Sequence, residues 1–164
     1  MRQDGSCVEL SPATLPRHPG VAYRVGMIRN GRCACGSIRY RVEGPMRPVI
    51  NCHCERCRRI TGHFMAATGC DDSMLVLESN SSLSWYEPAP GIFYGFCGAC
   101  GSTLFWRADS IPGRISIAAG SLDRPTGLTT EKAWWTSEAP DYHVLDPTIE
   151  SFETEPRDHA EEVS

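Results

Sequence analysis

Most of the nine cysteines in this chain stand in three short groups whose spacing suits metal coordination. A two-residue gap lets a tight turn direct both sulfurs at one point, and a Cys-x-Cys pair on an extended segment places both side chains on the same face. Backbone N–H groups of such a turn can also donate to the thiolates. The three groups are Cys33 and Cys35, then Cys52, Cys54 and Cys57, then Cys97 and Cys100.

These seven thiols do not divide into two closed tetrahedral sites. A structural zinc is closed by four protein ligands, whereas a catalytic zinc has three and keeps a fourth position for water or substrate. The count of seven thiols therefore predicts two Zn²⁺ ions per chain, one in a structural site with four ligands and one in an open site with three. Spacing does not settle the pairing, but one group is the natural set of three, called here the cysteine triad: Cys52, Cys54 and Cys57. The other thiols would share the structural ion and are called here the four-cysteine cluster: Cys33, Cys35, Cys97 and Cys100.

A fourth protein ligand would close the second site and make both ions structural. His53, His63 and Cys70 are the candidates. His53 stands between two proposed ligands, so its side chain should point away from the metal they share. His63 is better interpreted as a surface or cavity residue, and Cys70 as a small buried apolar side chain. The open site is therefore the favoured interpretation.

The cysteine content also bears on the compartment. An odd number of cysteines, in a chain whose residues 1–15 lack the apolar stretch of a secretory signal, argues against a disulfide scaffold. Reduced thiolates in the cytoplasm are the better expectation. No apolar run approaches the roughly 18 residues of a membrane span, so no membrane partner is expected.

Charge is unevenly distributed along the chain. Residues 1–61 carry a net charge of +7, all of the positive charge coming from arginine, and residues 62–164 carry −11, which together give −4. Arginine offers a fork of donors to carboxylates and phosphates, yet the acidic pI of about 5.7 argues against a nucleic-acid partner. A solvated surface with compensating charges is the favoured interpretation of this asymmetry, and the sequence predicts no oligomeric state.

Short apolar segments broken by turn residues predict a mostly β fold with few or no long helices. Ile38, Tyr40 and Val42 alternate with charged residues and predict a strand with one buried face. A single helical turn is expected after Cys57 or near residues 133–135. The remaining predicted strands are 64–68, 74–77, 83–87, 92–96, 102–106 and 114–118.

One domain, residues 27–145, is expected to account for most of the chain. Residues 1–26 are rich in proline, glycine and serine and predict a flexible N-terminal extension. Residues 146–164 are acidic and poor in aromatic residues, which predicts a solvated C-terminal tail.

Three motifs in order resemble the glutathione-dependent formaldehyde-activating enzyme family, whose domain is shared with the centromere protein V group. They are Gly-x-Cys-x-Cys-Gly at 31–36, Cys-His-Cys-x-x-Cys-Arg-Arg-x-Thr-Gly at 52–62 and Phe-Cys-x-x-Cys-Gly-Ser at 96–102. Ala-Gly-Ser-Leu-Asp at 119–123 also resembles the family. The resemblance covers residues 27–145 and implies a β-tent fold, related to the Mss4-like fold. It also implies a structural zinc on the four-cysteine cluster and a catalytic zinc on the cysteine triad.

The same resemblance implies a carbon–sulfur lyase that condenses glutathione, or another small thiol, with formaldehyde to an S-hydroxymethyl adduct. The residues are compatible with this chemistry, because an open zinc can lower the pKa of a substrate thiol and hold the thiolate for attack on a carbonyl carbon. Arg58 and Arg59 follow the third triad cysteine, and they are expected either to hold carboxylates of the thiol or to form a solvent-facing basic turn. Glu55 is a candidate general base by proximity. Trp134 and Trp135 are candidate cavity walls, although core packing is the favoured interpretation for at least one of them.

Two other functions are compatible with the same residues. A non-catalytic zinc module that binds a protein or nucleic acid would use the basic half of the chain. A zinc hydrolase or isomerase that acts on another small carbonyl compound would use the same open site, and the sequence does not separate it from the lyase.

Overall fold

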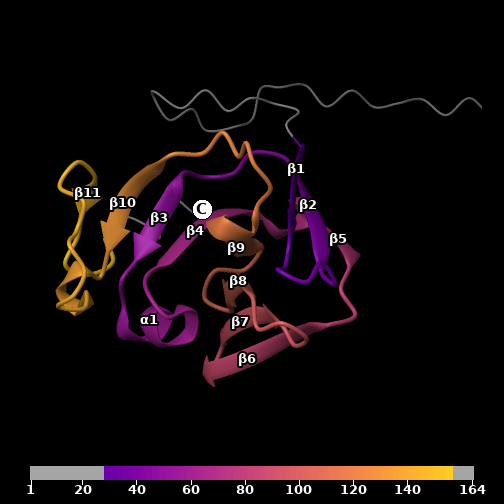
Figure 1. The fold of residues 1–164 in the computed structure, drawn as a ribbon, viewed down its shortest axis with the longest axis horizontal. Coiled ribbons are helices and arrows are strands. Elements are labelled where there is room, and N and C mark those ends of the chain that lie inside the picture. The colour runs from indigo at the N-terminus through magenta and orange to yellow at the C-terminus, as the bar shows by residue number, and fades with distance from the viewer. Residues whose placement is uncertain (1–27, 157–164) are drawn as a thin grey trace, which may run out of the picture.

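The structure, a computed structural model, describes residues 28–156. Within these residues the chain forms two β-sheets and one short α-helix, which confirms the mostly β prediction (Figure 1). A small sheet of three strands lies on the right in this view, and a large sheet of eight strands occupies the rest of the described chain.

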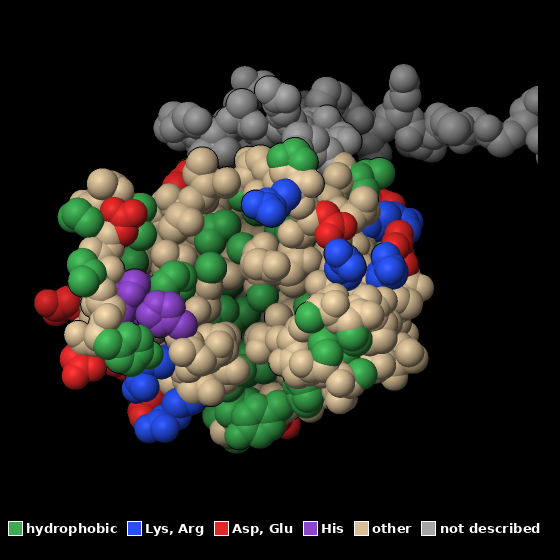
Figure 2. All heavy atoms as spheres, viewed as in Figure 1, with side chains coloured by type: hydrophobic (Ala, Val, Ile, Leu, Met, Phe, Trp, Pro, Cys, Tyr) green, Lys and Arg blue, Asp and Glu red, His purple; other side chains and the backbone are tan. Residues whose placement is uncertain are grey.

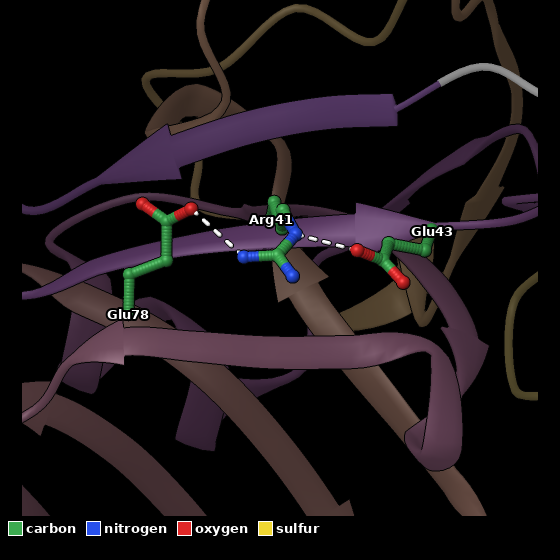
Figure 3. Close-up of polar contacts among 3 residues, drawn as sticks. All are labelled: Arg41, Glu43 and Glu78. Carbon is green, nitrogen blue, oxygen red and sulfur yellow. Dashed lines mark hydrogen bonds and ion pairs between the residues drawn. The ribbon is translucent and has the colours of Figure 1, made fainter. Parts of the chain in front are cut away.

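The small sheet is antiparallel and has the strand order β1-β2-β5. Its strands are β1 (Ile28–Arg32), β2 (Arg39–Glu43) and β5 (Leu75–Ser79). Because side chains alternate along a strand, β2 buries Tyr40 and Val42 and turns Arg41 to the other face. There Arg41 binds Glu43 and Glu78, the latter at 3.1 Å (Figure 3). Exposed ion pairs of this kind contribute little, so the buried face stabilises the sheet.

The large sheet has the order β11-β10-β3-β4-β9-β8-β7-β6. Neighbouring strands are antiparallel, except that β10 runs parallel to both β3 and β11. The strands are β3 (Val49–Cys52), β4 (Met65–Asp71), β6 (Leu83–Ala89), β7 (Ile92–Cys97), β8 (Thr103–Ala108), β9 (Arg114–Ala118), β10 (Thr130–Trp134) and β11 (Glu150–Ser151).

The main core joins the two sheets. Tyr40 of β2 meets Phe105 of β8 edge to face, with ring centroids 5.1 Å apart, and both side chains are fully buried. This is the geometry that aromatic pairs prefer. A smaller buried cluster lies beside the cysteine triad and contains Cys57, Met65, Ala67 and Tyr94. The triad therefore rests on packed side chains and not on a loose loop.

Helix α1 (Glu55–Thr61) begins ahead of the turn predicted after Cys57. Cys54 is its N-cap and accepts the N–H of Cys57 on its sulfur at 3.4 Å, in the role that oxygen-bearing side chains usually take. Gly62 ends the helix with a φ of 84°, a conformation that glycine adopts without strain. The helical turn considered near residues 133–135 is instead the end of β10, and the 3₁₀ helix η3 (Thr136–Glu138) follows it.

All seven predicted strands are present, as β2 and β4 to β9. Strands β1, β3, β10 and β11 have no counterpart in the prediction. Their sequences are short and show no alternation of apolar and polar residues, and β10 and β11 pair with partners distant in the chain. The two other 3₁₀ helices are η1 (Asp72–Met74) and η2 (Ala119–Ser121).

The described chain stays attached to the large sheet beyond residue 145. Strand β11 pairs with β10, and the N–H of Phe152 donates to the carbonyl of Ala133 at 2.8 Å. This pairing uses backbone groups, so the acidic composition after residue 146 does not reveal it. The predicted extension, residues 1–26, lies outside the described residues, and the division into extension, domain and tail stays a prediction. No helix within residues 28–156 is both long and apolar enough to span a membrane.

Candidate metal centres

The four-cysteine cluster joins the two sheets. Cys33 and Cys35 lie in the turn between β1 and β2, Cys97 ends β7, and Cys100 lies in the tight turn before β8. The four sulfur atoms all lie within 4.8 Å of one another. Gly101 closes the second turn with a φ of 77°. Two hairpins that are more than 60 residues apart in sequence thus meet at one group of thiols.

The geometry of this cluster fits a tetrahedral metal ion. Zinc–thiolate bonds of about 2.3 Å in a tetrahedron place the sulfurs about 3.8 Å apart. The sulfur of Cys35 lies 3.5 Å from that of Cys33 and 3.8 Å from that of Cys97. The N–H of Ile38 donates to the sulfur of Cys33 at 3.3 Å. A hydrogen bond with Ser102 lowers the pKa of Cys100 to about 5, which favours the thiolate that a metal requires.

The cysteine triad lies where β3 passes into α1. Cys52 ends β3, Cys54 caps the helix, and Cys57 lies in its first turn. Their sulfurs also lie within 4.8 Å of one another, with Cys57 buried and the other two half-buried. Antiparallel pairing of Cys52 with Met65 on β4 holds the end of β3 in place.

The pKa values of the three triad thiols shift in different directions. A hydrogen bond with Cys52 lowers the pKa of Cys54, and the same contact raises the pKa of Cys52. Backbone N–H groups of the first helical turn also favour the charged form of Cys54. A thiolate at Cys54 is the form that ligates metals.

No histidine or acidic side chain within residues 28–156 completes the triad. The candidate fourth ligands all lie elsewhere. The ring of His53 is buried and stacks on His143 with centroids 5.2 Å apart, and His63 meets His143 edge to face at 4.6 Å. Figure 2 shows histidine side chains gathered at one place on this face of the molecule. Cys70 lies on β4 in the main core.

A cavity of about 770 Å³ adjoins the triad. Apolar and aromatic side chains form most of its wall, as is usual for small-molecule sites. Charged side chains are present as well, and they are Arg47, Arg56, Arg59, Glu55, Glu138 and Glu155. The aromatic and large apolar residues of the wall are Tyr94, Trp106, Trp134, Trp135, Ile50, Ile92, Ile111 and Met65. Three donors with a free side that faces a cavity can bind a metal ion and a small molecule together.

Tyr94 is a site residue that sequence reasoning missed. It lies on β7, is buried, and its hydroxyl oxygen is 3.4 Å from the sulfur of Cys57. Burial raises the pKa of Tyr94, so the hydroxyl stays protonated and can donate to a thiolate. Strand alternation places Tyr94 on a buried face, but only the fold shows that α1 lies opposite.

The two arginines predicted to bind substrate lie in different environments. Arg59 lines the cavity, and its side chain, 70% exposed, pairs with Glu55 one helical turn earlier at 2.8 Å. Arg58 is half-buried and is not among the described residues that line this cavity. The carboxylate of Glu55 is therefore engaged in an ion pair with Arg59. The backbone N–H of Glu55 donates to the carboxylate of Glu138.

Glu155 is a further site residue, after Tyr94, that the sequence analysis did not identify. It lies on the cavity wall near the triad, although the residue itself is exposed. Burial of part of the side chain, and then the charge of Cys54, raise the pKa of its carboxyl. Trp134 and Trp135 both line the cavity, as expected for its walls.

Comparison with known proteins identifies the family. The sequence profile of the glutathione-dependent formaldehyde-activating enzymes matches residues 28–138. A protein of Halomonas elongata that carries the name of that enzyme is 29% identical over 107 residues, and the match covers 59% of this chain and 67% of that protein. A crystal structure of a Rhodobacter sphaeroides protein, 23% identical, matches with a TM-score of 0.50 over 62% of this chain and 97% of the other. This likeness concerns the fold alone and is consistent with a β-tent. Because the profile spans most of the described residues, the chain belongs to the glutathione-dependent formaldehyde-activating enzyme family.

Proposed function

We propose that the protein is a zinc-dependent carbon–sulfur lyase that condenses a small thiol, such as glutathione, with formaldehyde. The cysteine triad holds the catalytic zinc, and the four-cysteine cluster holds the structural one. One observation supports this most strongly. Three sulfurs lie within 4.8 Å of one another without a fourth described protein donor, and they adjoin a cavity of about 770 Å³. A structural zinc site is closed by four protein ligands and leaves no coordination position open towards a cavity.

The proposed reaction forms one bond between sulfur and carbon. The thiol sulfur attacks the carbonyl carbon of formaldehyde, the carbon–oxygen π bond breaks, and the thiol proton ends on the new hydroxyl. Zinc on the triad would lower the pKa of the substrate thiol and keep its sulfur nucleophilic. The carboxylate of Glu155, at the cavity wall, is available to accept the thiol proton.

Other residues of the chain prepare the site for this step. Tyr94 donates to Cys57 and thereby limits the negative charge that three thiolates place on one point. Trp106, Trp134 and Trp135 give the cavity apolar walls that keep water away from the reacting atoms. The need for reduced cysteines supports a cytoplasmic location as part of this proposal.

Turnover tests this proposal directly. Exchange between ¹³C-labelled formaldehyde and its glutathione adduct is measured by NMR with the zinc-loaded protein. We expect the wild type to accelerate exchange and Cys54→Ser to abolish the acceleration while circular dichroism shows an intact fold. Cys70→Ala removes a thiol from the core and serves as the matched control, which keeps the activity. Loss of activity in both variants, or in neither, would contradict the proposal.

A cavity beside the triad also separates the competing functions. A macromolecular partner needs an exposed surface, whereas this site is walled by aromatic side chains and suits a small molecule. If the zinc-loaded protein leaves the formaldehyde exchange unchanged but turns over another small carbonyl compound, the hydrolase or isomerase is the correct assignment.

A further inference from the structure

Arg47 is a half-buried cation on the wall of the triad cavity. It lies just before β3, and its Nη1 donates to the carbonyls of Pro48 at 3.0 Å and Ala67 at 2.8 Å. Its Nη2 lies 3.5 Å from the hydroxyl of Ser116, a weak contact. Its backbone carbonyl accepts the hydroxyl of buried Thr68. The contacts with Ala67 of β4 and Ser116 of β9 thus hold the guanidinium in a defined position on the cavity that it shares with the triad.

No carboxylate within residues 28–156 forms an ion pair with Arg47. Arg41 and Arg59, in contrast, pair with glutamates on the surface. The positive charge of Arg114 repels the guanidinium. The charge of Cys52 attracts the guanidinium, so the triad supplies part of the balancing charge. A half-buried cation without a carboxylate partner among the described residues still favours an anion that enters the cavity from outside.

Arg47 is charged at neutral pH despite this environment. Burial, and then the charge of Arg114, lower its pKa to about 10, which leaves it protonated under ordinary conditions. A guanidinium offers five N–H donors, and the contacts within the described residues use three of them. Donors remain for a ligand, and a planar fork suits a carboxylate better than any other common group in small thiols.

We propose that Arg47 binds a carboxylate of the thiol substrate and thereby selects carboxylate-bearing thiols. The inference rests on the proposed function, because it names the class of thiol that the same cavity accepts. It assigns the recognition of the carboxylate to Arg47, ahead of Arg58 and Arg59. Arg58 lies outside the residues that line the cavity, and Arg59 is exposed at its edge with Glu55 as a partner.

Binding of an unreactive ligand tests the inference without turnover. S-methylglutathione carries both carboxylates of glutathione, but its thioether cannot react with formaldehyde. Its dimethyl ester has the same shape without the negative charges. Binding of each to the full, zinc-loaded chain is followed by tryptophan fluorescence, since Trp106, Trp134 and Trp135 line the cavity. We expect the wild type to bind the acid at least about tenfold more tightly than the ester, as one charged hydrogen-bonded contact implies.

Variants assign this preference to one residue. Arg47→Gln should reduce the preference for the acid to less than about twofold, and Arg47→Lys should retain part of it. Arg41→Gln removes an arginine of the small sheet and is the matched control, which keeps the wild-type preference. If Arg47→Gln fails to fold, the comparison of acid and ester on Arg47→Lys and wild type still applies.

Two results would overturn the inference. One is a wild type that binds the ester as tightly as the acid, and the other is a folded Arg47→Gln that keeps the full preference. A failed lyase assignment gives a different result, because the acid preference would then persist in a protein without formaldehyde exchange.

Discussion

The hydroxyl of Tyr94 lies 3.4 Å from the sulfur of Cys57 and connects β7 to α1 beside the triad. Both side chains are buried, so water does not compete for this contact. Hydrogen bonds to metal-ligating groups orient the ligand and tune the charge that the metal receives. Tyr94 would therefore act on a metal at the triad through Cys57, which makes it a positioning residue.

Removal of this hydroxyl should weaken metal binding at the triad. Tyr94→Phe keeps the buried ring and removes the hydrogen bond to Cys57, and partners of this kind are worth about 10–100-fold in metal affinity. Competition with a chromophoric zinc chelator measures the affinity of each site. Tyr40→Phe is the matched control, because Tyr40 is buried equally and its hydroxyl bonds Ser121 at 2.6 Å, away from the triad. Equal weakening in both variants would show that the Tyr94 contact has no special role.

The two cysteine sites should differ in their effect on stability. Cys97 is fully buried and ties the two sheets together, so Cys97→Ser should lower the melting temperature by roughly 10 °C or more through loss of the structural metal. Cys54 is half-buried at the edge of a cavity, so Cys54→Ser should shift it by less. Thermal unfolding followed by circular dichroism compares the two, and the reverse order would contradict the assignment of structural and catalytic sites.

Gly31 should be required for the pairing of β1 with β2, which holds the turn that carries Cys33 and Cys35. A Cβ atom at this position would overlap the ring of Tyr40, which is packed in the core and cannot move aside. Gly31→Ala is therefore expected to cost about 1–3 kcal/mol in the free energy of unfolding. Gly120→Ala is the control, since open space surrounds that position, and its effect should stay within about 0.5 kcal/mol. Urea denaturation provides both values.

Because of Cys70, the free energy of unfolding should fall as the pH rises from about 9 towards 11. Burial raises the pKa of its thiol from 9.0 to about 11, so the folded state holds the proton more tightly than the unfolded state. The resulting stabilisation is complete below pH 9 and is lost as the pH rises towards 11, with a limit of about 2–3 kcal/mol. Urea unfolding at pH 8 and pH 10.5 is compared for the wild type and Cys70→Ala. A wild type that loses no more stability than the variant would refute this assignment.

Much of the fold could be predicted from the sequence because its signals are local. Alternation over Ile38, Tyr40 and Val42 reports a half-buried strand whatever its partner is, and glycine and proline punctuate the hairpins. The grouping of the cysteines followed from counting ligands, and the structure brings the same two sets together. Strands β3 and β10 were not predicted, because they pair in parallel with each other across about 80 residues and no local sequence pattern encodes such a pairing.

The chemistry of the cavity depends on tertiary placement and could not be predicted in the same way. Arg58 and Arg59 were chosen by proximity in sequence to the triad, yet the helix directs them differently, and only Arg59 lines the cavity. Arg47 and Tyr94 reach the cavity from the start of β3 and from β7. A residue's nearness to the triad along the chain is therefore a poor guide to its nearness in space.

Zinc per chain is the measurement that tests the account most directly. Elemental analysis is made on the wild type and on the triple variant Cys52→Ser, Cys54→Ser and Cys57→Ser, with circular dichroism to verify the fold. The account predicts two zinc ions in the wild type and one in a folded triple variant. One zinc in the wild type that the triple change leaves in place would contradict a metal at the triad, and with it the proposed lyase.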